Sequence, residues 1–66
     1  MRLKNGDYYT NVHSNKQYKL NEDNNSNWYL SVDDKEGYQE TERLSGRDMI
    51  RLVNADYTKS YSTSVR

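Results

Sequence analysis

This chain contains no residue pair that could cross-link it. Among its 66 residues there is no cysteine, and the single histidine excludes a structural metal held by cysteine and histidine. A chain of this length buries only about 60% of the surface that its unfolded form exposes, so the core is marginal. Domains this small usually need a cross-link, a metal or a partner. The fold must therefore be held by side-chain packing or by a partner.

The supply of apolar side chains is also small. Leu, Ile, Val and Phe together account for ten of the 66 residues, a fraction typical of disordered chains when the net charge is high. Here the formal net charge is zero, and the chain has seven tyrosines and one tryptophan. Each aromatic side chain can bury about 150–250 Å². We therefore expect a folded domain with an aromatic-rich core.

Alternation of apolar and polar residues predicts four strands in the first two thirds of the chain. They are expected near residues 7–12, 16–21, 28–33 and 38–44. The clearest is "WYLSV", in which Trp28, Leu30 and Val32 fall on one face and Tyr29 on the other. The fourth is polar on both faces, which indicates a position near an edge of the sheet.

The periodicity changes at Ser45. Ser45 and Asp48 fit a helical N-terminal capping box, and the sequence predicts a helix near residues 46–54. At about 100° per residue, four apolar side chains share one arc of this helix, and Arg47 and Arg51 lie opposite. Residues 57–65 alternate as a closing strand would, and they fit a polar tail equally.

These elements predict one α+β domain, mainly β, over residues 1–66. Its expected architecture is a small SH3-like or barrel-like antiparallel sheet of four to five strands, with one short helix near the C-terminus. The segment "MRLKNGDYY" has no apolar stretch typical of a secretory signal, and no apolar run is long enough to span a bilayer. We therefore expect a cytoplasmic protein.

The zero net charge hides a segregation along the chain. The net charge is +3 over residues 1–21, −6 over 22–42 and +3 over 43–66. The acidic middle segment predicts a hairpin that could attract a basic partner before contact. Tyrosine and arginine are the residues that anchor protein interfaces. The candidate protein-binding residues are Asp33, Asp34, Glu36, Glu40, Glu42, Tyr29 and Tyr38.

Two functional hypotheses follow from these patterns. The first is a non-enzymatic protein-binding module. In its narrower form, this module is an inhibitor of a host nucleic-acid-handling protein and is encoded by a phage or mobile element, because chains of this size are frequent there. The abundance of Asn, Lys and Tyr suggests an AT-rich genome. The alternative is a nucleic-acid-binding module that uses exposed tyrosines and a patch of basic residues. That patch would contain Arg43, Arg47, Arg51 and Lys59.

Catalysis is not indicated by any motif. The three glycines are isolated from one another, so there is no glycine-rich phosphate loop. His13 is the only side chain whose unperturbed pKa lies near neutrality, and it is expected in a polar turn without a neighbouring carboxylate or nucleophile. We therefore expect no enzymatic activity, no cofactor and no metal site.

Overall fold

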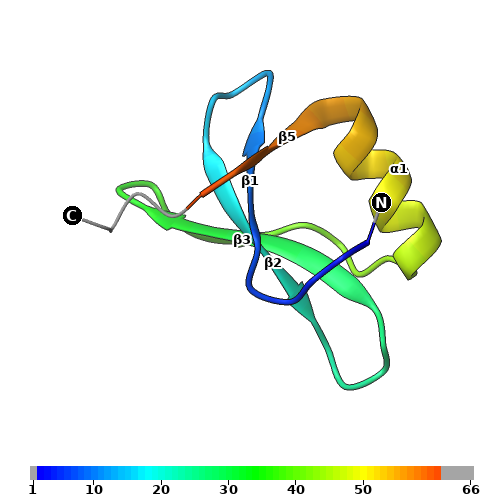
Figure 1. Cartoon of the computed structure of the whole chain (residues 1–66). Helices are drawn as coiled ribbons and strands as arrows, with labels where there is room; N and C mark the ends of the chain where they lie inside the picture. Colours follow the sequence, from blue (N-terminus) through cyan, green and yellow to red (C-terminus); the bar gives the residue numbers. More distant parts are fainter. Residues whose placement is uncertain (1, 62–66) are drawn as a thin grey trace.

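The computed structural model describes residues 2–61, which form a five-stranded antiparallel sheet and one helix (Figure 1). In chain order the elements are β1 (Tyr8–Asn11), β2 (Gln17–Glu22), β3 (Trp28–Asp34), β4 (Gly37–Glu40), α1 (Gly46–Asp56) and β5 (Tyr57–Ser60). The strand order across the sheet is β4-β3-β2-β1-β5. The expected mainly β fold with one short helix near the C-terminus is confirmed. The return of β5 to β1 is compatible with an SH3-like arrangement, although β4 and β5 do not pair within residues 2–61.

An Asn or Asp side chain organises each of the three hairpin turns. Asn11 Oδ1 accepts the N–H groups of His13 and Ser14 in the first turn, both at 2.9 Å. Asp23 Oδ1 accepts two N–H groups in the second turn, at 2.8 and 3.0 Å, and Asp34 Oδ1 accepts the Glu36 N–H at 2.9 Å in the third. Such side chains imitate the backbone contacts of a turn. At Gly37, which ends the third turn, φ is +105°, a value that favours glycine.

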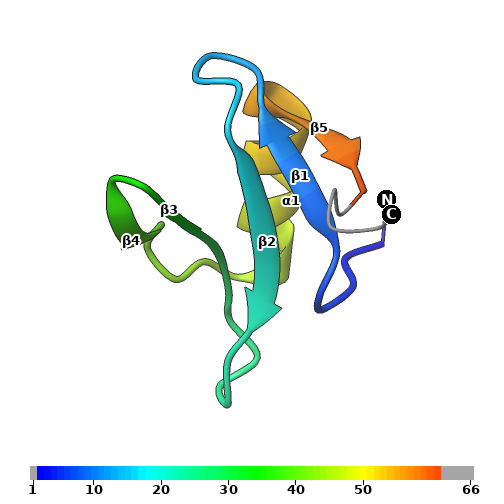
Figure 2. The same ribbon diagram turned by 90° about the vertical axis from the view of Figure 1, so that its left-hand side faces the viewer.

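The core lies between one face of the sheet and α1 (Figure 2). Leu20 and Leu30 face each other across β2 and β3, and both are fully buried. Met49 and Val53 from α1 cover them, while Arg47 on the same helix is exposed. Val32 is buried as expected. Trp28 is only half-buried and packs against the edge of this cluster.

The helix begins as the capping pattern predicts and runs two residues further than expected. The Ser45 hydroxyl accepts the Asp48 N–H at 3.2 Å, which satisfies one of the donors left free in the first turn. The expected end was residue 54, and the helix ends at Asp56. Tyr57 caps it in an extended conformation and is also the first residue of β5. The helix therefore passes into the last strand without a linker.

The fourth strand ends at Glu40 instead of residue 44, because a β-bulge follows it. Since Ser31 lies opposite Glu40, an unbroken register would bring Arg43 opposite Trp28. Leu44 lies there instead, and it exchanges two backbone hydrogen bonds of 2.7 and 2.8 Å with Trp28. The segment 41–43 thus holds one residue more than the part of β3 that it faces. As a result, Leu44 packs on the core and Arg43 turns to the opposite face.

The closing strand pairs with β1 along its whole length. Tyr8 lies opposite Ser60, and Asn11 lies opposite Tyr57. The Tyr57 ring meets the Tyr18 ring edge to face, with centroids 5.6 Å apart, and burial raises the pKa of Tyr57. The sequence fitted either a strand or a polar tail here, and residues 57–60 form a strand. The rest of the expected 57–65 strand, from residue 62, lies outside the described residues.

Candidate functional site

The face of the sheet opposite α1 carries a cluster of tyrosine, arginine and carboxylate side chains. Strand alternation places Tyr29, Ser31 and Asp33 of β3 on this face, because Leu30 and Val32 point into the core. From β4, Tyr38 lies opposite Asp33, and Glu40 lies opposite Ser31. The tip of the β3–β4 hairpin lies on the side of the molecule away from α1 in both views (Figures 1 and 2). This face is therefore not covered by the helix.

Arg43 is the centre of this cluster. Its guanidinium carbon lies 3.6 Å from the centroid of the Tyr29 ring, within the range of a cation–π contact. Its Nη1 lies 3.1 Å from Glu40 Oε1, and its Nε lies 3.4 Å from Asp23 Oδ2. The Arg43 side chain is held from three sides and is still 42% exposed. The β-bulge is what brings it here.

Glu40 joins Arg43 to Tyr38. The Tyr38 hydroxyl donates a 2.7 Å hydrogen bond to Glu40 Oε2, while the other oxygen of the same carboxylate pairs with Arg43. This hydrogen bond raises the pKa of Tyr38, so its hydroxyl stays protonated. Tyr38 is nevertheless 58% exposed. We call Asp23, Tyr29, Tyr38, Glu40 and Arg43 the Tyr29–Arg43 cluster.

The acidic turn of the hairpin is partly neutralised within the molecule. Lys16, the residue before β2, places its Nζ 2.6 Å from Glu36 Oε1 and 3.4 Å from Asp34 Oδ2. The Glu36 N–H and then Lys16 hold the pKa of Asp34 below its usual range, and the same carboxylates raise the pKa of Lys16. Of the predicted acidic site residues, only Asp33 and Glu42 take part in none of the ion pairs within residues 2–61.

The predicted basic residues do not share one surface. Arg43 lies on the helix-free face with the carboxylates. Arg47 and Arg51 are exposed on α1, on the other side of the sheet, and Arg51 lies 3.9 Å from Asp48. Lys59 lies on β5 and places its Nζ 4.6 Å from the centroid of the Tyr61 ring. The structure thus separates Arg43 from the two helical arginines.

The environment of His13 differs from the expectation. Its Nε2 lies 3.1 Å from Asp56 Oδ1, so a carboxylate from the end of α1 does approach the first hairpin turn. The His13 side chain is 72% exposed, and this pair joins the first hairpin turn to the end of α1, outside the Tyr29–Arg43 cluster. Within residues 2–61 no three His, Cys, Asp or Glu side chains are arranged to hold a metal ion. The one helix in this range is too short and too polar to cross a membrane.

Sequence reasoning missed the part that Asp23 and Lys16 play at this face. Asp23 was counted in the acidic segment 22–42 and Lys16 in the basic segment 1–21, and neither was assigned a contact. Both contacts depend on how distant segments meet, since Lys16 and Glu36 are 20 residues apart. The charge segregation could have indicated these ion pairs. Residues 22–42 contain seven acidic groups and one basic group, Lys35, so their charge has to be offset by cations from other segments.

No protein-family model, curated protein or solved structure matches this chain. The candidate site therefore rests on its geometry and chemistry alone.

Proposed function

We propose that this chain is a non-enzymatic protein-binding module whose contact surface is the Tyr29–Arg43 cluster. The observation that carries the proposal is the position of Arg43, which is stacked on Tyr29 and bonded to Glu40 and Asp23 while its outer surface stays exposed. Tyrosine and arginine side chains contribute most to binding at protein interfaces. A side chain that is already fixed loses little conformational entropy on association. The cluster thus has the residue types that favour a contact site, and its side chains are already held in fixed conformations.

The chemistry around the cluster favours a basic partner. Asp33 and Glu42 are exposed and have no ion-pair partner within residues 2–61. Lys16 and Arg43 only partly offset the remaining carboxylates. A negative surface around tyrosine anchors suits a protein with a basic surface. Proteins that handle nucleic acids carry such surfaces, so the narrower proposal is an inhibitor of one of them.

Affinity capture tests the proposal. The tagged chain is used to recover partners from a lysate of the cells in which it occurs, with and without nuclease. We expect a protein that persists after nuclease treatment and is lost with Tyr38→Ala, because Tyr38 is exposed and not part of the core. The matched control is Arg47→Gln/Arg51→Gln, which changes the opposite side and should leave recovery unchanged. Recovery that needs nucleic acid and follows the helical arginines would support the nucleic-acid hypothesis instead.

Binding kinetics with the recovered partner then separate the roles of charge and contact. We expect Asp33→Asn to slow association at low salt, since long-range attraction acts before contact. Tyr38→Ala should act mainly on dissociation, because short-range contacts determine how long a complex lasts. An association rate that responds neither to salt nor to Asp33→Asn would remove the acidic surface from the mechanism.

A further inference from the structure

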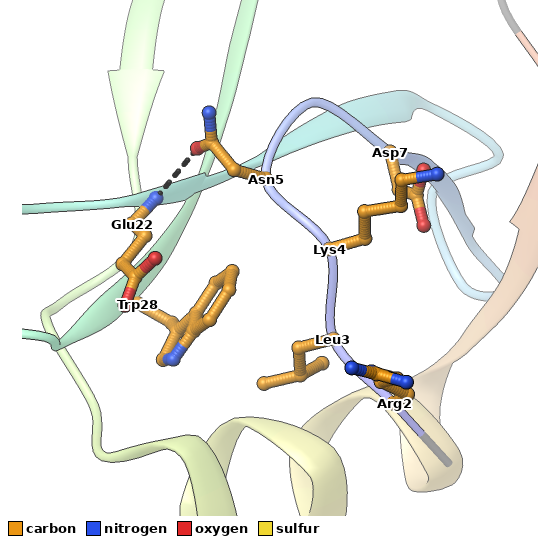
Figure 3. Close-up of a pocket in the computed structure, with 7 residues that line it drawn as sticks. All are labelled: Arg2, Leu3, Lys4, Asn5, Asp7, Glu22 and Trp28. Atoms are coloured by element: carbon orange, nitrogen blue, oxygen red, sulfur yellow. Dashed lines mark hydrogen bonds between the residues drawn. The ribbon is translucent and has the colours of Figure 1, made fainter.

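The surface of the molecule is hollowed at the end of the sheet beside Trp28. An open pocket of about 670 Å³ separates the segment before β1 from the first residue of β3 (Figure 3). Leu3 and Trp28 supply its apolar surface, and both pack against the core on their inner side. Its volume lies within the range of sites that bind small molecules or single side chains. None of its lining residues belongs to the Tyr29–Arg43 cluster.

The wall of this pocket is held by backbone hydrogen bonds. The Gly6 N–H donates to the Leu20 carbonyl, and the Leu20 N–H donates to the Asp7 carbonyl, both at 2.8 Å. Asn5 Oδ1 accepts the Glu22 N–H at 2.9 Å, as the dashed line in Figure 3 shows. Gly6 adopts a φ of +95°, which lets the chain turn here. The segment before β1 is thus fixed to β2, and the pocket is formed before any ligand enters.

The rim of the pocket carries two charges of each sign. Arg2 and Lys4 lie on the segment before β1, Asp7 follows them, and Glu22 ends β2. None of the four takes part in an ion pair within residues 2–61. Two carboxylates beside two cations give no net attraction for a polyanion, so the rim does not favour a nucleic acid. It fits a ligand that itself carries both charges around an apolar group.

We propose that the Trp28 pocket receives a large apolar side chain of a protein partner, flanked on that partner by one acidic and one basic residue. That the ligand is a protein rests on the proposed function. The indole offers a flat apolar surface, and the rim charges give orientation to the incoming segment. Glu22 and Asp23 are adjacent in sequence, as are Trp28 and Tyr29. The pocket and the Tyr29–Arg43 cluster therefore lie on two sides of the same loop, where one partner can contact both.

The test uses the fluorescence of Trp28, which is the only tryptophan in the chain. The probes are two capped tripeptides, Lys-Phe-Glu and Glu-Phe-Lys, with Lys-Gly-Glu and adenosine monophosphate as comparisons. We expect a saturable change with at least one of the two aromatic peptides and none with the glycine peptide. Glu22→Gln or Arg2→Gln should weaken binding of that peptide about three- to fivefold, as exposed charge pairs do. Tyr38→Ala should leave it unchanged.

Two results would overturn this inference. One is the absence of a saturable signal with both aromatic peptides at millimolar concentration. The other is stronger binding of adenosine monophosphate than of either peptide, which would assign the pocket to nucleotides. A negative peptide titration would not change the result of the affinity capture that depends on Tyr38. A negative affinity capture would likewise not prevent the peptide titration from being interpreted. The two proposals can therefore fail separately.

Discussion

The guanidinium group of Arg43 lies over the ring of Tyr29, 3.6 Å from its centroid. In the unbroken register of β3 and β4, Arg43 would lie opposite Trp28 and point toward the core. The extra residue in 41–43 removes that conflict, since a buried unpaired charge would be costly. One added residue thus protects the core and completes the exposed cluster.

Replacing Arg43 should measurably reduce stability although the residue is not buried. We expect Arg43→Gln to lower the free energy of unfolding by about 0.5–1 kcal/mol, because the cation–π contact is lost. Arg47→Gln is the control, since Arg47 is exposed and in no ion pair within residues 2–61, and it should change stability by less than about 0.5 kcal/mol. Urea denaturation measures both. Equal effects would mean that the Tyr29–Arg43 contact adds nothing to stability.

Deleting Glu42 tests the bulge. The deletion would restore an unbroken register in which Arg43 lies opposite Tyr29 and Leu44 stays opposite Trp28, so we expect a loss of no more than about 1 kcal/mol. Glu42→Ala keeps the number of residues and removes only an exposed side chain, so it should cost less than about 0.5 kcal/mol. The two variants are compared by their denaturation midpoints. A deletion that costs about 2 kcal/mol or more would show that Leu44 cannot keep its place on the core without the extra residue.

Acid should weaken the β3–β4 turn through Asp34. Its pKa is held low by the Glu36 N–H and by Lys16, whereas an unfolded aspartate has a pKa of about 3.9. Between the folded and unfolded pKa values the unfolded chain therefore binds more protons at Asp34 than the folded chain does. The contribution of Asp34 to stability is present above the unfolded pKa and is lost as pH falls through the folded pKa. We expect the stability gap between wild type and Asp34→Asn to close on acidification. Asp33→Asn, outside these ion pairs, should show no such convergence, and parallel curves for Asp34→Asn would contradict the prediction.

Two glycines should respond to alanine with opposite signs. Gly37→Ala has open space around the new methyl group, but a φ of +105° strains any other residue, so we expect a loss of about 1–3 kcal/mol. At Gly46 the methyl group would lie 3.5 Å from Trp28 Nε1, an ordinary contact. Alanine there favours the helix by up to about 1 kcal/mol. Thermal melts of the two variants give the comparison, and a destabilising Gly46→Ala would show that the Trp28 edge cannot accommodate the methyl group.

The alternation and helical periodicity of the sequence predicted which residues of β3 and α1 are buried. The alternation around Leu30 and Val32 identified buried positions of β3, and the helical period identified Met49 and Val53. The position of Arg43 could not be predicted in this way, because a bulge changes the register between two strands without changing either sequence pattern.

The candidate site was accordingly predicted only in part. Tyr29, Tyr38 and Glu40 were expected on the hairpin, and they lie together there. Arg43 was assigned to a basic patch and lies instead among carboxylates. The pocket beside Trp28 was not expected at all. Its other wall comes from Arg2 to Asp7, a segment that has no periodic pattern to read.

The pairing of β1 with β5 also determines when during synthesis the sheet can be completed. Residues 8–11 are synthesised before their partners 57–60, which are added nearly fifty residues later. Until then, the buried Tyr9 has only one of its two neighbouring strands, and Tyr18 lacks the Tyr57 ring. A nascent chain that pauses before β5 thus exposes an open sheet edge, which is the feature that favours aggregation. Rapid translation of the codons for residues 41–60 would shorten that exposure.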